Sequence, residues 1–135
     1  MQDRIQIAID NHDKKYNCAQ SVACAYCDLF GVDEQTTFRM AEAFGFGMGA
    51  MENCGAVTAM VLLAGMKISD GNLESPASKK LSYEVSKKMI EAFKEKNKTI
   101  VCSELKGLHT GEPIRSCNGC IEDAARIVES VLLEK

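Results

Sequence analysis

The sequence predicts an all-α fold, because apolar residues recur every three or four positions along most of its length. Alternation of apolar and polar residues, which would indicate strands with one buried face, does not stand out in any segment. Clusters of glycine, proline, asparagine and serine separate the periodic segments. These observations predict one compact domain of about five helices over residues 1–135, a length typical of a single domain.

The first third of the chain contains three segments with helical spacing. Apolar residues follow this spacing over residues 4–11 and again over residues 18–30. Gly31 can end the second segment, because glycine readily adopts the left-handed conformation found after helix C-termini. Asp33 can cap the free N–H groups at the start of a third helix, which we expect to run to about Phe44.

A glycine-rich loop comes next and precedes a helix that begins with a cysteine. Three glycines interrupt the helical pattern within residues 45–49. We expect Asn53 to cap a helix over residues 54–65, so that Cys54 lies in its first turn. The first N–H groups of a helix are unpaired and carry partial positive charge, so a thiol placed there ionises more easily.

In the second half of the chain, the spacing of apolar residues predicts one long helix and one C-terminal helix. Residues 67–77 are rich in loop-forming residues, and apolar residues then form one stripe over residues 78–96. Residues 99–105 are ambiguous, because their first residues favour a strand and their last four could form a helical turn. Glycine and proline indicate a loop over residues 109–116, and helical spacing returns over residues 121–133.

The charge balance and the distribution of apolar residues argue against several classes of function. A net charge of −3 gives no sign of the basic face that nucleic acid requires. No run reaches the roughly 18 apolar residues of a transmembrane helix, and the first residues lack the apolar segment of a secretory signal. We therefore expect a cytoplasmic protein. There, seven cysteines indicate metal, redox or catalytic chemistry rather than structural disulfides.

Five of the cysteines stand in distinctive local sequences. Cys18 lies in Asn-Cys-Ala-Gln, and Cys54 follows the glycine-rich run in Asn-Cys-Gly-Ala. Cys102 begins the sequence Cys-Ser-Glu-Leu. Cys117 and Cys120 form a C-x-x-C sequence at the expected start of the last helix, and such a pair can close a disulfide or supply two metal ligands.

In their order and spacing, these sequences resemble the C_GCAxxG_C_C family of redox-active proteins over roughly residues 16–128. The resemblance implies that four cysteines converge in space and take part in redox or metal chemistry, namely Cys18, Cys54, Cys102 and Cys117. One position departs from the family pattern, because Ala59 stands where a glycine is expected. No chemistry depends on that residue.

The favoured interpretation is thiol–disulfide exchange with an unidentified protein partner. Cys54 would be the attacking thiolate, because disulfide exchange proceeds through a mixed disulfide and requires an ionised thiol. Cys18, Cys102 or Cys117 would then resolve the mixed disulfide. This interpretation requires the partner to reach Cys54.

A metal-binding module is the alternative interpretation, and a helical protein with inert buried thiols is a third. In the alternative, zinc or an iron–sulfur cluster would be held by the same four cysteines, Cys18, Cys54, Cys102 and Cys117. Cys24 and Cys27 lie one helical turn apart among apolar residues, so we expect them to be buried and inert. His109 could activate a thiolate or be a plain loop histidine.

Overall fold

In the computed structural model, residues 3–133 are described and form seven α-helices with one isolated β-bridge. The all-α prediction is confirmed, but the number of helices is seven rather than about five. The helices are α1 (Arg4–Asp13), α2 (Cys18–Tyr26), α3 (Glu34–Ala41), α4 (Gly55–Ile68), α5 (Lys79–Asn97), α6 (Cys102–Leu105) and α7 (Cys117–Val128). One of them, α6, is a single turn, which is too short to leave a periodic pattern in the sequence.

Short turns extend three of these helices, at Cys27–Phe30, Glu42–Phe44 and Glu129–Leu133. The first of them ends at Gly31, which has the left-handed conformation predicted for it (φ 80°). Asp33 caps α3, as predicted, by accepting a hydrogen bond from the N–H of Thr36 at 2.9 Å. At the start of α2, Asn17 and Gln20 exchange side-chain and backbone hydrogen bonds in a capping box.

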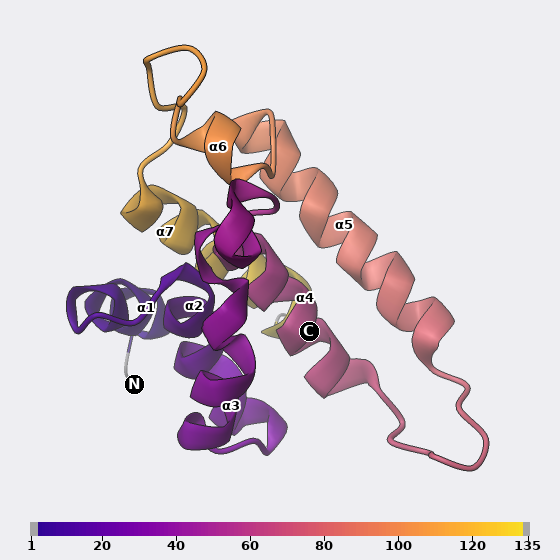
Figure 1. Cartoon of the computed structure of the whole chain (residues 1–135). Helices are drawn as coiled ribbons and strands as arrows, with labels where there is room; N and C mark the ends of the chain where they lie inside the picture. The colour runs from indigo at the N-terminus through magenta and orange to yellow at the C-terminus, as the bar shows by residue number, and fades with distance from the viewer. Residues whose placement is uncertain (1–2, 134–135) are drawn as a thin grey trace.

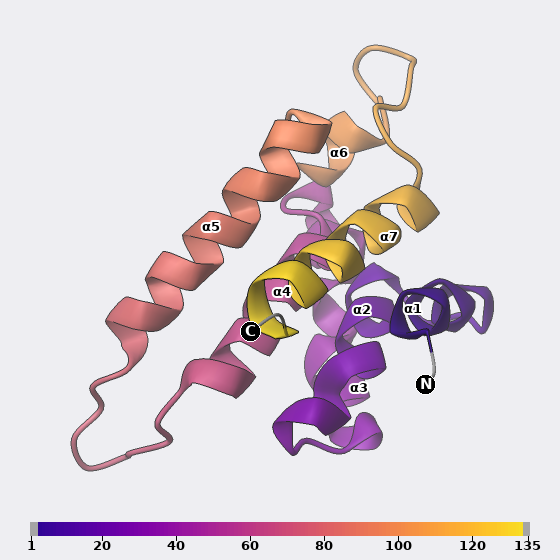
Figure 2. The same ribbon diagram turned by 180° about the vertical axis from the view of Figure 1, so that it is seen from behind.

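Helices α2 and α4 form the centre of the molecule (Figure 1). Every residue of α2 except the first is buried, and such a helix is surrounded by other elements. In the two ribbon views α1 lies beside α2, α5 runs along α4, and α7 packs against α4 on the face seen in Figure 2. Large core side chains come from four helices, namely Tyr26, Met60, Phe93 and Ile121.

A buried carboxylate fastens the start of α7 to the end of α5. The side chain of Asp123 is 1% exposed and accepts hydrogen bonds from Lys96 Nζ at 2.6 Å and from Asn97 Nδ2 at 3.1 Å. Arg115, just before α7, binds the same carboxylate through Nε at 3.0 Å and Nη2 at 3.1 Å. Because both oxygens are paired, the charge can be buried without an unsatisfied group.

The glycine-rich loop forms a left-handed turn. Backbone φ angles are positive at four consecutive residues, namely Phe46 (55°), Gly47 (60°), Met48 (61°) and Gly49 (73°). The two residues that carry side chains are strained there, by roughly 1–2 kcal/mol each. The surrounding structure must therefore hold this turn in place.

Asn53 does not cap α4, which corrects the sequence prediction. It pairs with Val101 in the isolated antiparallel bridge, and the extended chain that this pairing requires leaves Cys54 as the N-cap residue. Helix α4 therefore begins at Gly55, one residue later than expected. The ambiguous segment 99–105 contains both predicted features, because the bridge is followed directly by the single turn α6.

None of the helices between residues 3 and 133 combines the length and the apolar character that crossing a membrane requires.

Candidate functional site

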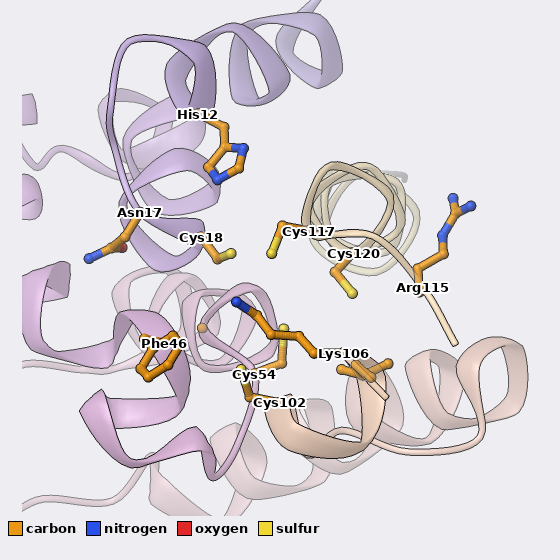
Figure 3. A pocket seen from close by; sticks show the side chains of 12 residues that line it. His12, Asn17, Cys18, Phe46, Cys54, Cys102, Lys106, Arg115, Cys117 and Cys120 are labelled. Carbon is orange, nitrogen blue, oxygen red and sulfur yellow. The ribbon is translucent and has the colours of Figure 1, made fainter. Parts of the chain in front are cut away.

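Five of the seven cysteines line one cavity of about 170 Å³. They are Cys18, Cys54, Cys102, Cys117 and Cys120. Figure 3 shows these side chains pointing toward one another from α2, α4, α6 and α7. The fold thus brings together the four cysteines of the sequence pattern, although they are spread over most of the chain, and adds a fifth.

Four of these cysteines lie at helix N-termini. Cys18, Cys102 and Cys117 are the first residues of α2, α6 and α7, and Cys54 is the N-cap residue of α4. The unpaired N–H groups of a first turn carry partial positive charge and stabilise a nearby thiolate. The arrangement therefore favours ionised sulfur in the cavity.

The isolated β-bridge holds two of these cysteines side by side. The backbone N–H of Cys54 donates to the carbonyl oxygen of Ile100 at 2.6 Å. The backbone N–H of Cys102 donates to the carbonyl oxygen of Glu52, also at 2.6 Å. These two bonds join the start of α4 to the start of α6, so residues about fifty positions apart in sequence share one wall of the cavity.

The left-handed turn packs directly against this wall. A Cβ atom added at Gly47 would lie 2.4 Å from the backbone nitrogen of Glu52 and 3.0 Å from the Cβ of Cys102. The absence of a side chain at Gly47 therefore allows the loop to approach the bridge closely. Phe46, the next residue back, lines the cavity itself.

Figure 3 shows the sulfurs of Cys18 and Cys117 facing one another, and we call these two residues the outer pair. The hydrogen bond to Cys117 and burial raise the pKa of Cys18 well above its ordinary value. The same bond, opposed by burial and supported by Lys106 and His12, lowers the pKa of Cys117 to about 6. This lowered pKa favours the thiolate form of Cys117 near neutral pH.

Cys54 and Cys120 are the two most deeply buried cysteines of the cavity, and we call them the inner pair. The bond from Cys120 lowers the pKa of Cys54, burial opposes this effect, and the backbone N–H groups of Ala56 and Val57 add to it. The bond to Cys54 and burial raise the pKa of Cys120. Burial also raises the pKa of Cys102, which Lys106 offsets in part.

The two pairs differ in their access to solvent. Cys54 is 5% exposed and Cys120 is 3% exposed, whereas Cys18 and Cys117 are both partly exposed. A molecule that enters the cavity therefore meets the outer pair first. Within that pair, Cys117 is the thiol with the lowered pKa.

Comparison with protein families places these cysteines in a known group. Residues 16–131 match the family described as "Putative redox-active protein (C_GCAxxG_C_C)". The chain belongs to the C_GCAxxG_C_C family. The matched range contains all five cysteines of the cavity, and the family description supports redox activity. Searches of curated proteins and of solved structures gave no significant match.

Three basic side chains also line the cavity of this C_GCAxxG_C_C protein, namely His12, Lys106 and Arg115. The ammonium of Lys106 lies 4.9 Å from the centre of the Phe46 ring. The ring nitrogen Nδ1 of His12 lies 2.7 Å from the amide oxygen of Asn118. Arg115 is held by the buried carboxylate of Asp123.

The sequence analysis missed part of the site. It left Cys120 outside the family pattern, although the C-x-x-C spacing puts it one helical turn from Cys117 and so on the same helix face. Lys106 stands four residues after Cys102, which is also a spacing of about one helical turn. His12 could not be found this way, because only the tertiary packing of α1 brings it to the cavity.

Two other groups lie away from the cavity. Cys24 and Cys27 are buried, as predicted, at 8% and 1% exposure, and burial is the main cause that raises the pKa of each. His109 lines a different surface pocket with Lys98 and Thr99. The suggested pairing of His109 with a cavity thiolate is therefore wrong, and His12 is the histidine beside the thiols.

Throughout residues 3–133, no group of three or more cysteine, histidine, aspartate or glutamate side chains is arranged to hold a metal ion. The cavity sulfurs are instead organised as the outer and inner pairs, with Cys102 beside them.

Proposed function

We propose that this C_GCAxxG_C_C protein carries out thiol–disulfide exchange with the outer pair as its reactive centre. The observation that supports this most is the position of Cys18 and Cys117, whose sulfurs face one another in the cavity and are less buried than those of Cys54 and Cys120 (Figure 3). In addition, the pKa of Cys117 is lowered to about 6. An exchange reaction needs a nucleophilic thiolate and a neighbouring thiol that can resolve the mixed disulfide. Cys117 and Cys18 meet these two needs.

In this mechanism the Cys117 thiolate attacks one sulfur of a partner disulfide. A Cys117–partner bond forms, the partner's S–S bond breaks, and the first partner sulfur leaves as a thiolate. Cys18 then loses its proton and attacks Cys117 Sγ, which expels the second partner thiolate. The outer pair is oxidised by two electrons and the partner disulfide is reduced by two; the reverse sequence oxidises a partner dithiol.

The inner pair can take over the oxidised state by the same chemistry. The Cys54 thiolate would attack Cys117 in the outer disulfide and release Cys18 as a thiolate. Cys120 would then give its proton to the released Cys18 thiolate, attack Cys54 and release Cys117 as a thiolate. The outcome is an inner disulfide and a reduced outer pair, with no further oxidant. In this proposal Cys54, which the sequence suggested as the attacking thiolate, acts after Cys117 because it is buried.

A titration in glutathione redox buffers tests the proposal. After each equilibration the free thiols are alkylated and the disulfides are mapped by mass spectrometry. We expect a reversible two-electron oxidation that yields the Cys18–Cys117 disulfide first. Cys117→Ser should abolish this step and Cys24→Ala should leave it intact. An outer pair that stays reduced while other cysteines oxidise would contradict the proposal.

The metal alternative is tested on the same protein purified without oxygen. It would use Cys18, Cys54, Cys102 and Cys117 as ligands to zinc or to an iron–sulfur cluster. Stoichiometric zinc or iron, with thiols that resist alkylation until a chelator is added, would overturn the dithiol proposal. Metal-free protein with freely titratable thiols would support it.

A further inference from the structure

The cavity is basic although the protein is acidic overall. The chain has 19 acidic and 16 basic residues, not counting histidine. Among the described residues that line the cavity, three are His, Lys or Arg and none is Asp or Glu. A cation in a cavity raises the local concentration of anions. The preference of this cavity for anions depends on a basic side chain whose charge is not already neutralised by a carboxylate.

Lys106 is the basic group that remains available to a ligand. Arg115 already donates through Nε and Nη2 to both oxygens of the Asp123 carboxylate, which neutralises its charge. Within residues 3–133, Lys106 takes part in no ion pair, and its ammonium rests over the Phe46 ring. Figure 3 shows the Lys106 side chain extending among the cavity cysteines, and its charge acts on Cys18, Cys102 and Cys117.

The size of the cavity restricts what can enter it. Its volume is about 170 Å³, whereas drug-sized ligands occupy roughly 300–1,000 Å³. A compact molecule of a few heavy atoms fits, but a bulky segment of a folded partner does not. The cavity must also accept something that reacts with a thiolate, because the Cys117 side chain faces it.

We propose that the cavity receives a small anion with an electrophilic sulfur–sulfur bond, of the thiosulfonate and polythionate class, and that Lys106 positions it for attack by Cys117. This inference rests on the proposed function and names the class of oxidant that the outer pair reduces. Lys106 is needed because a thiolate alone repels an anion. The Lys106 ammonium, whose charge already acts on Cys117, offsets this repulsion.

The chemistry balances with tetrathionate as the example. Cys117 thiolate attacks an inner sulfur of tetrathionate, the central S–S bond breaks, and thiosulfate leaves with the electron pair. Cys18 then loses its proton to solvent and attacks Cys117 Sγ, which expels a second thiosulfate. One tetrathionate accepts two electrons and becomes two thiosulfates, and the outer pair becomes a disulfide.

Charge-matched thiol reagents test the inference directly. Three methanethiosulfonates, with a sulfonate, a neutral methyl or a trimethylammonium group, are reacted with the reduced protein, and labelling of the Cys117 peptide is timed. We expect the sulfonate reagent to react about tenfold faster than the trimethylammonium reagent, at the low end of the range for electrostatic steering. Because both reagents react with the same Cys117 thiolate, a change in the ionised fraction of Cys117 does not alter the ratio of the two rates.

Lys106→Met should bring this ratio to one or below, and Lys88→Met, on the exposed face of α5, should leave it unchanged. Added salt should reduce the ratio in the unmodified protein, which provides a readout if Lys106→Met does not fold. Equal rates for the two charged reagents in the unmodified protein, or an unchanged ratio in a folded Lys106→Met variant, would overturn the inference.

A final measurement uses tetrathionate itself. One equivalent should convert the outer pair to a disulfide and release two equivalents of thiosulfate, with Lys106→Met slowed more than Lys88→Met. Reversible oxidation in glutathione buffers without any charge preference would refute the anion site and leave the exchange function standing. Charge preference without reversible oxidation would refute the exchange function instead.

Discussion

At the level of single residues, the acidity of the cavity thiols comes mainly from one another. The largest effect on the pKa of Cys117 is its hydrogen bond with Cys18, and the largest effect on that of Cys54 is its hydrogen bond with Cys120. In each pair the pKa of one thiol is lowered and that of the other is raised. The nearby helix N-termini and Lys106 add to an effect that the pairing establishes.

Cys117 is expected to react first with a limiting amount of iodoacetamide at pH 7. Its pKa of about 6 makes it largely ionised, and it is more exposed than the inner pair. Its alkylation rate should rise as the pH passes about 6 and become constant above about pH 7. The alkylation rate of an ordinary thiol continues to rise up to about pH 8.5. Peptide mapping at several pH values gives the seven rates.

Cys18→Ser and Cys18→Ala together provide the matched test of the pairing. Because serine keeps a hydrogen-bond donor, Cys18→Ser should leave the pKa of Cys117 lowered. Cys18→Ala removes the donor and should move the pKa of Cys117 to a higher value, while Cys24→Ala should leave it near 6. If Cys54 is alkylated before Cys117 in the unmodified protein, the sequence-based choice of Cys54 as the attacking thiolate is right and the outer pair is not the reactive centre.

Asp123→Asn should lower the free energy of unfolding by about 3 kcal/mol at pH 7, because it removes the buried charge that Lys96 and Arg115 bind. Glu122→Gln, in an exposed pair with Arg126, should cost less than about 1 kcal/mol. Urea unfolding of both variants measures the difference. Equal losses for the two variants would show that the buried network contributes no more than a surface pair.

The Asp123 contribution should also depend on pH. Burial raises the pKa of this carboxyl, but its hydrogen bonds from Lys96, Arg115 and Asn97 outweigh burial and leave the pKa below its ordinary value. A lowered folded-state pKa means that the stabilisation is present above about pH 4 and is lost as the pH falls through the folded value. The difference in the free energy of unfolding between the unmodified protein and Asp123→Asn should therefore disappear under acid conditions.

At the level of elements, the connections shape the cavity as much as the helices do. The left-handed turn packs on the bridge, and the bridge aligns the starts of α4 and α6. The single turn α6 then presents Lys106, its C-cap residue, to the cavity. These short segments carry little periodicity, yet they determine where Cys54 and Cys102 meet.

Gly47→Ala should destabilise the protein more than Gly49→Ala, by about 1–3 kcal/mol. Both residues have positive φ, so both substitutions share a left-handed penalty of roughly 1 kcal/mol. Only at Gly47 does the new Cβ meet backbone at 2.4 Å, whereas at Gly49 nothing lies within 4 Å. The difference in the free energy of unfolding between the two variants, measured with urea, gives the cost of the steric clash at Gly47. Equal losses of free energy in the two variants would show that the turn can move away from Glu52.

The longer helices and the family can be predicted from the sequence, but the short segments between the helices cannot. Apolar spacing and caps such as Asp33 identified the longer helices, because these signals are local. The N-cap role of Cys54 was missed, because it depends on the pairing of Asn53 with a residue almost fifty positions away. Local sequence patterns also cannot predict which cysteines lie next to one another, because this depends on the packing of α7 against α2 and α4.

At the level of the whole molecule, the cavity lies where separate parts of the chain meet. Cys18 comes from the N-terminal part, Cys54 and Cys102 from the middle, and Cys117 from the last helix (Figure 3). Thiol oxidation would therefore add covalent bonds between elements that are otherwise held by packing and a few hydrogen bonds. The redox state should influence the stability of the entire fold.

Oxidation of the outer pair should raise the free energy of unfolding by about 2–4 kcal/mol, because a disulfide between α2 and α7 closes a loop of roughly 100 residues and restricts the unfolded chain. Urea unfolding of the oxidised and the reduced protein tests this. The gain should vanish in Cys18→Ser and persist in the double variant Cys24→Ala, Cys27→Ala. An oxidised form no more stable than the reduced one would contradict a Cys18–Cys117 disulfide.

The left-handed turn has a stereochemical consequence. Phe46 and Met48 occupy a backbone region that is the preferred one for residues of opposite chirality. In a chain assembled by chemical synthesis, the D enantiomers of phenylalanine and methionine at positions 46 and 48 would each relieve roughly 1–2 kcal/mol. Mirror-image amino acids, which disrupt right-handed helices, would thus suit this short segment of the protein better than the natural ones.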